Sequence, residues 1–150
     1  MDQAHVYLVV VTGLAVYFVG VSLMTTQVSY PMYASVPKEA FVAYHARYNR
    51  RIRAVIIAPG FPTFLAWVVF PFLRPDTAPA WAALLVAAGG VTALATTFGG
   101  AIPAHVRLQR DGFTPSAYRR LRTADVIRTA GCLLSATALI ICALATFTPR

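Results

Sequence analysis

Polar side chains that could carry out chemistry gather near the ends of long apolar runs in this sequence. Histidine is well suited to act as a general base near neutral pH. Charged groups near the hydrocarbon of a bilayer are costly, so they usually face the interior of a helix bundle or pair with one another. The residues that we predict to be catalytic are His105, His45, Asp125 and Arg128. Those that we predict to bind a ligand are Gln27, Tyr30, Tyr33 and Arg53.

Two of these residues, Asp125 and Arg128, lie three positions apart, which places them on one face of a helix. We expect them to pair with each other and to point inward. Arg53 has two interpretations: its side chain either reaches out to lipid phosphates or meets Asp125 across the bundle. Asp125 in turn could cap the start of a helix.

The side chains of His45, His105 and Asp125 include the donor types of a metal site. The sequence holds no His-x-x-x-His or Glu-x-x-His pair, so we predict no metal ligands. Neither histidine lies in the middle of an apolar run, where a haem held by two histidines would need them. The sequence therefore leaves the cofactor unassigned. Each histidine alone also fits a hydrogen bond to the backbone or to lipid headgroups.

The elements that must position these residues are four membrane spans. Hydrophobic residues make up 58% of the 150 residues and charged residues 12%, with a mean hydropathy of +0.64. A helix needs roughly 20 apolar residues to cross a bilayer core about 30 Å thick. Four such runs occur, at residues 6–28, 54–73, 80–102 and 126–147. We therefore predict one all-α integral membrane domain over residues 1–150, a bundle of four transmembrane helices.

The basic residues lie mainly on one side of these spans. Eleven of the 13 Lys and Arg fall between spans 1 and 2, between spans 3 and 4, or just inside span 4, and the other two are Arg74 and Arg150. Because loops rich in Lys and Arg stay in the cytoplasm, both termini are predicted to lie outside it. No nucleic-acid-binding motif surrounds the arginines, so the net charge of +8 indicates topology and not a nucleic-acid partner.

The two halves of the chain match when the sequence is shifted by 72 residues. Thr25 then meets Thr97, Pro31 meets Pro103, and the Lys-Glu-x-Phe run at 38–41 meets an Arg-Asp-x-Phe run. The match predicts a parallel duplication of two helical hairpins, related by a pseudo-two-fold axis along the membrane normal. A pocket on that axis would be a natural place for a ligand. The simpler explanation is that basic loops between apolar helices share residues by chance.

Prolines and glycines predict how the helices begin, bend and pack. Pro37 and Pro115 mark helix starts, and both helices should lie at the membrane interface and then run into spans 2 and 4. Pro59 in span 2 predicts a kink, with or without a cavity beside it. The glycine pairs at 89–90 and 99–100 predict close packing of span 3 against its neighbours.

Short motifs along the chain resemble those of a known group of proteins. One set is Gln27-x-x-Tyr30-Pro31, Phe41-x-x-Tyr44-His45, Arg50-Arg51-Ile52 and Pro59. The other is Pro103-x-His105-x-x-Leu108, Gly112-Phe113, Arg119-x-Leu121 and Asp125-x-x-Arg128-Thr129. The chain resembles uncharacterised four-span bacterial membrane proteins that are distantly similar to the anthrone-oxygenase-like family. That broader family tends to carry Asn near positions 105 and 125, where this chain has His105 and Asp125.

The resemblance implies a place in the bacterial inner membrane and a hydrophobic substrate held between helices. Anthrone oxygenases oxidise a reduced aromatic polyketide with O₂, without a classical cofactor. The first expectation is a cytoplasm-facing pocket for an aromatic or quinone-like molecule, in which His105 or His45 takes a proton and Arg128, paired with Asp125, steadies the anion. The second is a non-catalytic accessory subunit that packs through span 3 against a larger membrane complex. The third is small-molecule transport by a homo-oligomer, although spans 1 and 3 lack the intramembrane acid typical of ion pathways.

Overall fold

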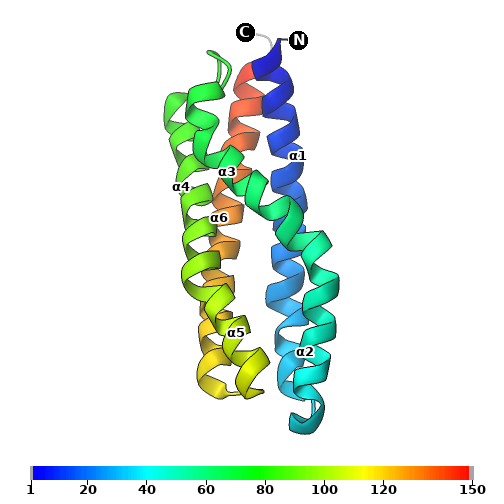
Figure 1. Ribbon diagram of the computed structural model, residues 1–150. Helices are drawn as coiled ribbons and strands as arrows, with labels where there is room; N and C mark the ends of the chain where they lie inside the picture. The colour runs from blue at the N-terminus through cyan, green and yellow to red at the C-terminus, as the bar shows by residue number, and fades with distance from the viewer. Residues whose placement is uncertain (1, 149–150) are drawn as a thin grey trace.

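The computed structural model describes residues 2–148, and Arg150 lies outside them. Four helical stretches are long and apolar enough to cross a membrane: Gln3–Ser35, Lys38–Leu73, Ala80–Asp111 and Pro115–Phe147. They run alternately up and down, and both ends of the chain lie at the same end of the bundle (Figure 1). The prediction of an all-α bundle with four helical stretches long and apolar enough to span a membrane is confirmed, and residues 2–148 contain no strand.

Three of the four stretches combine α-helix with short 3-10 or π-helical segments. The first consists of α1 (Gln3–Met24), the π-helical η1 (Thr25–Ser29) and the 3-10 helix η2 (Pro31–Ser35). The second consists of α2 (Lys38–Ile52), the π-helical η3 (Arg53–Ile57) and α3 (Ala58–Leu73). The third consists of α4 (Ala80–Thr96), the π-helical η4 (Thr97–Ala101) and α5 (Ile102–Asp111). The fourth stretch is the single helix α6 (Pro115–Phe147).

Prolines explain where the three π segments form. η1, η3 and η4 each end two residues before a proline, at Pro31, Pro59 and Pro103. A proline has no N–H, so a carbonyl one turn earlier loses its helical partner. Near Pro59 this partner is replaced by the Tyr17 hydroxyl, which donates to the Val55 carbonyl at 2.8 Å. The predicted kink is present: α2 runs beside the lower part of α1, whereas α3 crosses toward α4 (Figure 1).

Arginines of α6 satisfy freed carbonyls at the other two π segments. Arg120 donates to the Gly99 carbonyl at 2.7 Å, four residues before Pro103. Arg122 donates to the Thr26 carbonyl, five residues before the proline that follows η1. A buried carbonyl without a partner destabilises a fold, so these side chains help to make the π segments tolerable.

The core divides into two clusters along the bundle, which define an apolar half near the termini and a basic half at the α2–α5 end. The largest fully buried side chains of the apolar half are Leu8, Phe18, Trp67, Phe70 and Leu139. Those of the basic half are Tyr33, Phe41, Leu108 and Leu121. The 33 residues of α6 extend over about 50 Å, which exceeds a hydrocarbon core of about 30 Å.

Both predicted helix starts are confirmed, since α2 begins directly after Pro37 and α6 begins at Pro115. Both helices also continue into the next span as predicted. They extend the bundle, because their buried faces, with Phe41 on α2 and Leu121 on α6, contribute to the aromatic core of the basic half. Their place at a membrane interface stays a prediction.

Small residues bring α4 and α6 together in the apolar half. A Cβ on Gly89 would collide with the Ser135 side chain and with the backbone of Gly131. Ser135 also donates from Oγ to the Val86 carbonyl at 2.9 Å, so its hydroxyl is satisfied. Close packing at 89–90 is therefore confirmed. Close packing at 99–100 is confirmed through Gly100, where an added Cβ would lie 2.5 Å from the Cβ atom of Ala124 on α6, whereas the space beside Gly99 is open.

Candidate functional site

A cavity of about 620 Å³ lies in the basic half, between α2 and η3 on one side and η4 and α5 on the other. The cavity therefore lies beside the kink between α2 and α3. The apolar residues that line it are Ile52, Ile56, Ile57, Ala101, Ile102 and Val106. The polar residues that line it are Tyr30, Asn49, Arg53, Thr97, His105, Gln109, Arg110 and Arg128. Of the predicted site residues, Tyr30, Arg53, His105 and Arg128 meet at this cavity.

A glutamine sets the tautomer of the first histidine beside this cavity. Gln109 donates from Nε2 to the Val42 carbonyl at 3.3 Å, which turns its Oε1 atom toward His45. The Nδ1 atom of His45 lies 2.9 Å from that Oε1 atom. The Nδ2 atom of Asn49 lies farther from Nδ1, at 3.2 Å, so we assign the hydrogen of neutral His45 to Nδ1, where it is donated to the Gln109 oxygen. The Nε2 atom of His45 is therefore left as an acceptor.

The second histidine continues this order of donors and acceptors. His105 Nδ1 lies 2.9 Å from His45 Nε2, so Nδ1 donates and His105 Nε2 is left as an acceptor. The Tyr30 hydroxyl lies 3.1 Å from that Nε2 atom and donates to it. Tyr30, His105, His45 and Gln109 thus form one directed chain of hydrogen bonds, which we name the Tyr30–Gln109 chain.

The two histidines have different access to the cavity. His105 lines it, whereas His45 is fully buried behind His105 and is absent from the lining. The imidazole rings are stacked with their centroids 5.2 Å apart. Only His105 can therefore take a proton directly from a molecule in the cavity, and His45 can act only through His105.

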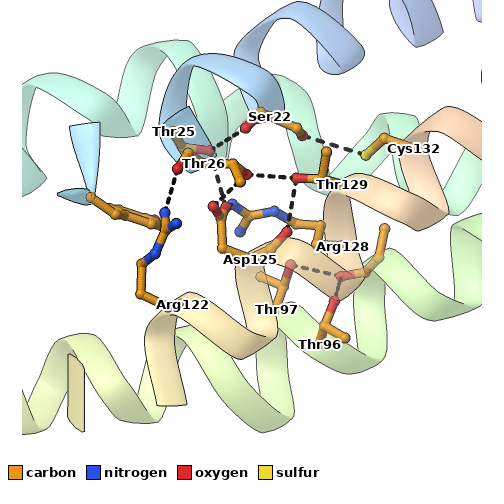
Figure 2. Close-up of polar contacts among 12 residues, drawn as sticks. Ser22, Thr25, Thr26, Thr96, Thr97, Arg122, Asp125, Arg128, Thr129 and Cys132 are labelled. Atoms are coloured by element: carbon orange, nitrogen blue, oxygen red, sulfur yellow. Dashed lines mark hydrogen bonds and ion pairs between the residues drawn. The ribbon is translucent and has the colours of Figure 1, made fainter. Parts of the chain in front are cut away.

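A buried polar cluster lies next to the cavity, on α6 and η1 (Figure 2). Asp125 is fully buried, and its carboxylate accepts from Thr25 Oγ1 at 3.0 Å and from Thr26 Oγ1 at 2.7 Å. The same carboxylate forms an ion pair with Arg128, which is 6% exposed. The expected inward pair is therefore confirmed. Asp125 lies within α6 and does not cap it.

Arg128 connects this cluster to the cavity. Its guanidinium pairs with Asp125 on one side and lies beside the Tyr30 hydroxyl on the other, and both Arg128 and Tyr30 line the cavity. A cation held in this position can stabilise negative charge that develops on a molecule in the cavity. Its charge is compensated by Asp125, so the free protein does not bury an unpaired ion.

Three more of the predicted residues, Arg53, Tyr33 and Gln27, lie in different environments. Arg53 is exposed at the rim of the cavity, and within residues 2–148 it makes no ion pair with Asp125, so the alternative in which the two meet is wrong. Tyr33 is fully buried, with its ring centroid 5.6 Å from that of His45. Gln27 is exposed and does not line the cavity.

Sequence reasoning misses Asn49 and Gln109, both of which line the cavity and face His45. A signal was present, because Asn49 follows His45 by four residues and Gln109 follows His105 by four, which places each pair on one helix face. In the described part of the chain, no group of three or more His, Cys, Asp or Glu is placed to hold a metal ion.

No protein-family model, no curated protein and no solved structure matches this chain. The fold and the site are therefore the observations that indicate the class of protein. Four long apolar helices are compatible with a multi-pass membrane protein. The site is an apolar cavity with an imidazole, a phenol and a guanidinium in its lining.

Proposed function

We propose that this multi-pass membrane protein binds a hydrophobic aromatic or quinone-like molecule in the cavity and removes a proton from it. One observation carries the proposal: His105, whose Nε2 atom is a hydrogen-bond acceptor, lines the same cavity as the isoleucines. A volume of about 620 Å³ falls in the range of small-molecule sites. The anthrone-oxygenase-like resemblance agrees with this chemistry by analogy only.

The chain's residues have distinct parts in the proposed reaction. His105 Nε2 exchanges its hydrogen bond with Tyr30 for one with the ligand and accepts the proton. The His105 imidazolium that forms is stabilised by His45 Nε2, which already accepts from Nδ1. Arg128 stabilises the ligand anion. An anthrone-type ring deprotonated in this way would react with O₂ to give the quinone and water.

The proposal includes a parallel duplication of two hairpins, with both termini outside the cytoplasm of a bacterial inner membrane. Two observations support the duplication. η1 and η4 are π-helical and lie 72 residues apart. The cavity lining also contains two pairs with the same offset, Tyr30 with Ile102 and Ile56 with Arg128. The positive-inside rule supports the orientation, since the arginine-rich α2 and α5 lie at the end opposite the termini (Figure 1).

The accessory-subunit alternative depends on small residues of α4 that a partner could contact. Gly89 faces Ser135 of α6, and Gly90 faces Phe64 and Trp67 of α3. These glycines are used within the chain, so they offer little surface to a larger complex. Ligand binding is the function that the cavity supports directly, so we place the accessory subunit second and transport by a homo-oligomer third.

The test is turnover of anthrone by purified protein in nanodiscs, followed by anthraquinone absorbance and O₂ consumption. Replacing His105 by Ala should lower the rate at least about 100-fold, because a positioned general base contributes about that much. His5→Ala is the matched control, since His5 lies in the apolar half and pairs with Asp2. Equal rates for the wild type and His105→Ala would contradict the proposed base, and failure of the wild type to bind anthrone would contradict the proposed site.

A further inference from the structure

All charged side chains that line the cavity are arginines: Arg53, Arg110 and Arg128. Within the described chain, no aspartate or glutamate shares the lining. Arginine side chains remain protonated at any physiological pH, so the cavity has a fixed positive character.

Two of the three arginines are already neutralised by a nearby carboxylate. Arg110 donates to Asp111 from Nε at 2.6 Å and from Nη2 at 2.9 Å. Arg128 is paired with the buried Asp125. The side chain of Arg53, by contrast, makes no hydrogen bond or ion pair with any other residue in 2–148. Arg53 is therefore the cation that remains available to a ligand.

The position of Arg53 determines where a ligand anion would lie. Arg53 is exposed at the rim and belongs to η3, between Ile52 and Ile56, which also line the cavity. His105 lies on the opposite wall, on α5. A molecule that contacts both must have an apolar body along the isoleucines and a charged group at the rim. Arginine matches the two oxygens of a carboxylate with two parallel hydrogen bonds.

Resting on the proposed function, we infer that the ligand is an amphipathic carboxylate. It has an aromatic ring system, a carboxylate that binds Arg53 at the rim, and a weakly acidic O–H or C–H group that faces His105. The Arg53 guanidinium binds the carboxylate of the ligand, and His105 takes the proton from the weakly acidic group at the other end.

The test compares two probes that differ only in the anion, 6-hydroxy-2-naphthoate and 2-naphthol, by equilibrium binding to the full-length protein in nanodiscs of zwitterionic lipid. The wild type should bind the naphthoate at least about tenfold more tightly, a factor that corresponds to about 1.4 kcal/mol. Arg53→Gln should remove this preference and leave naphthol binding unchanged. Arg107→Gln is the matched control, since Arg107 is exposed and outside the cavity lining.

The outcomes separate this inference from the function on which it rests. Equal affinity for the two probes, or a preference that survives in Arg53→Gln, would overturn the carboxylate inference while the cavity still binds a ring. If neither probe binds to the wild type, the proposed function fails and the inference fails with it. In nanodiscs that contain an anionic phospholipid, the preference should persist; its loss there would assign Arg53 to lipid phosphate and overturn the inference.

Discussion

The apolar and basic halves of the bundle use the same four helical stretches but pack in different ways. In the apolar half, α4 and α6 approach so closely that Gly89 has no room for a side chain. In the basic half, the core is aromatic, and a cavity of about 620 Å³ remains between the hairpins. The π segments η1, η3 and η4 lie where one half meets the other (Figure 1).

This difference shows how a small membrane-type bundle can hold a polar site. Small side chains let helix backbones meet and leave no space for a ligand. Where large rings replace them and π turns interrupt the α-helices, the helices leave a cavity between them, and buried charges can be paired, as Asp125 is with Arg128. We therefore expect substitutions in the apolar half to change stability alone, and those at the cavity to change ligand binding as well.

The largest effect should come from the charge pair between the halves. Replacing Arg128 by Met leaves Asp125 buried without its cation, which should lower the free energy of unfolding by about 3–5 kcal/mol. Reversible unfolding in mixed micelles of mild detergent and dodecyl sulfate measures this change. The double variant Asp125→Asn with Arg128→Met should recover more than half of the loss. A single variant as stable as the wild type would mean that the buried Asp125 carboxylate does not need the Arg128 cation.

An intermediate effect is expected from the closest helix contact of the apolar half. Gly89→Ala should destabilise by about 1–3 kcal/mol, because the added methyl group must push α4 away from Ser135 and Gly131. Ligand affinity at the cavity should stay the same. Gly13→Ala is the control, since the space beside Gly13 is open. Similar unfolding free energies for the two variants would show that the contact of α4 with α6 at Gly89 is not tight.

The smallest effect should occur at the kink. Tyr17→Phe removes the donor to the Val55 carbonyl and should cost about 0.5–1.5 kcal/mol. Tyr44→Phe controls for the general loss of a hydroxyl, because in the described chain the Tyr44 hydroxyl makes no hydrogen bond. A cost no greater than that of the control would show that water or a neighbouring N–H satisfies this carbonyl instead.

Local patterns account for the features that could be predicted from sequence. The spans follow from apolar runs, the helix starts from Pro37 and Pro115, and the Asp125–Arg128 pair from a three-residue spacing on one helix. Each of these depends on residues close together in the chain. For the glycine pair at 99–100 the sequence predicts a close approach but not which glycine makes it: Gly100 faces Ala124 and Gly99 faces open space, because this depends on which helix lies opposite.

The contact between the histidines could not be predicted in the same way. His45 and His105 are 60 residues apart, and they meet only because α2 packs against α5. The π segments were missed as well, although the prolines that follow them were visible. A proline indicates a freed carbonyl, but the response of the helix depends on donors from elsewhere, such as Arg120 at Gly99.

The π-helical turn η4 determines the direction in which His105 points. A π turn holds one more residue than an α turn, so in geometric terms η4 equals a single-residue insertion. One residue turns an α-helix by about 100°. A chain shortened by one residue within Thr97–Ala101 could close η4 into regular α-helix, and the imidazole of His105 would then be rotated out of the cavity. The direction of the His105 side chain therefore depends on the number of residues that precede it as well as on their identity.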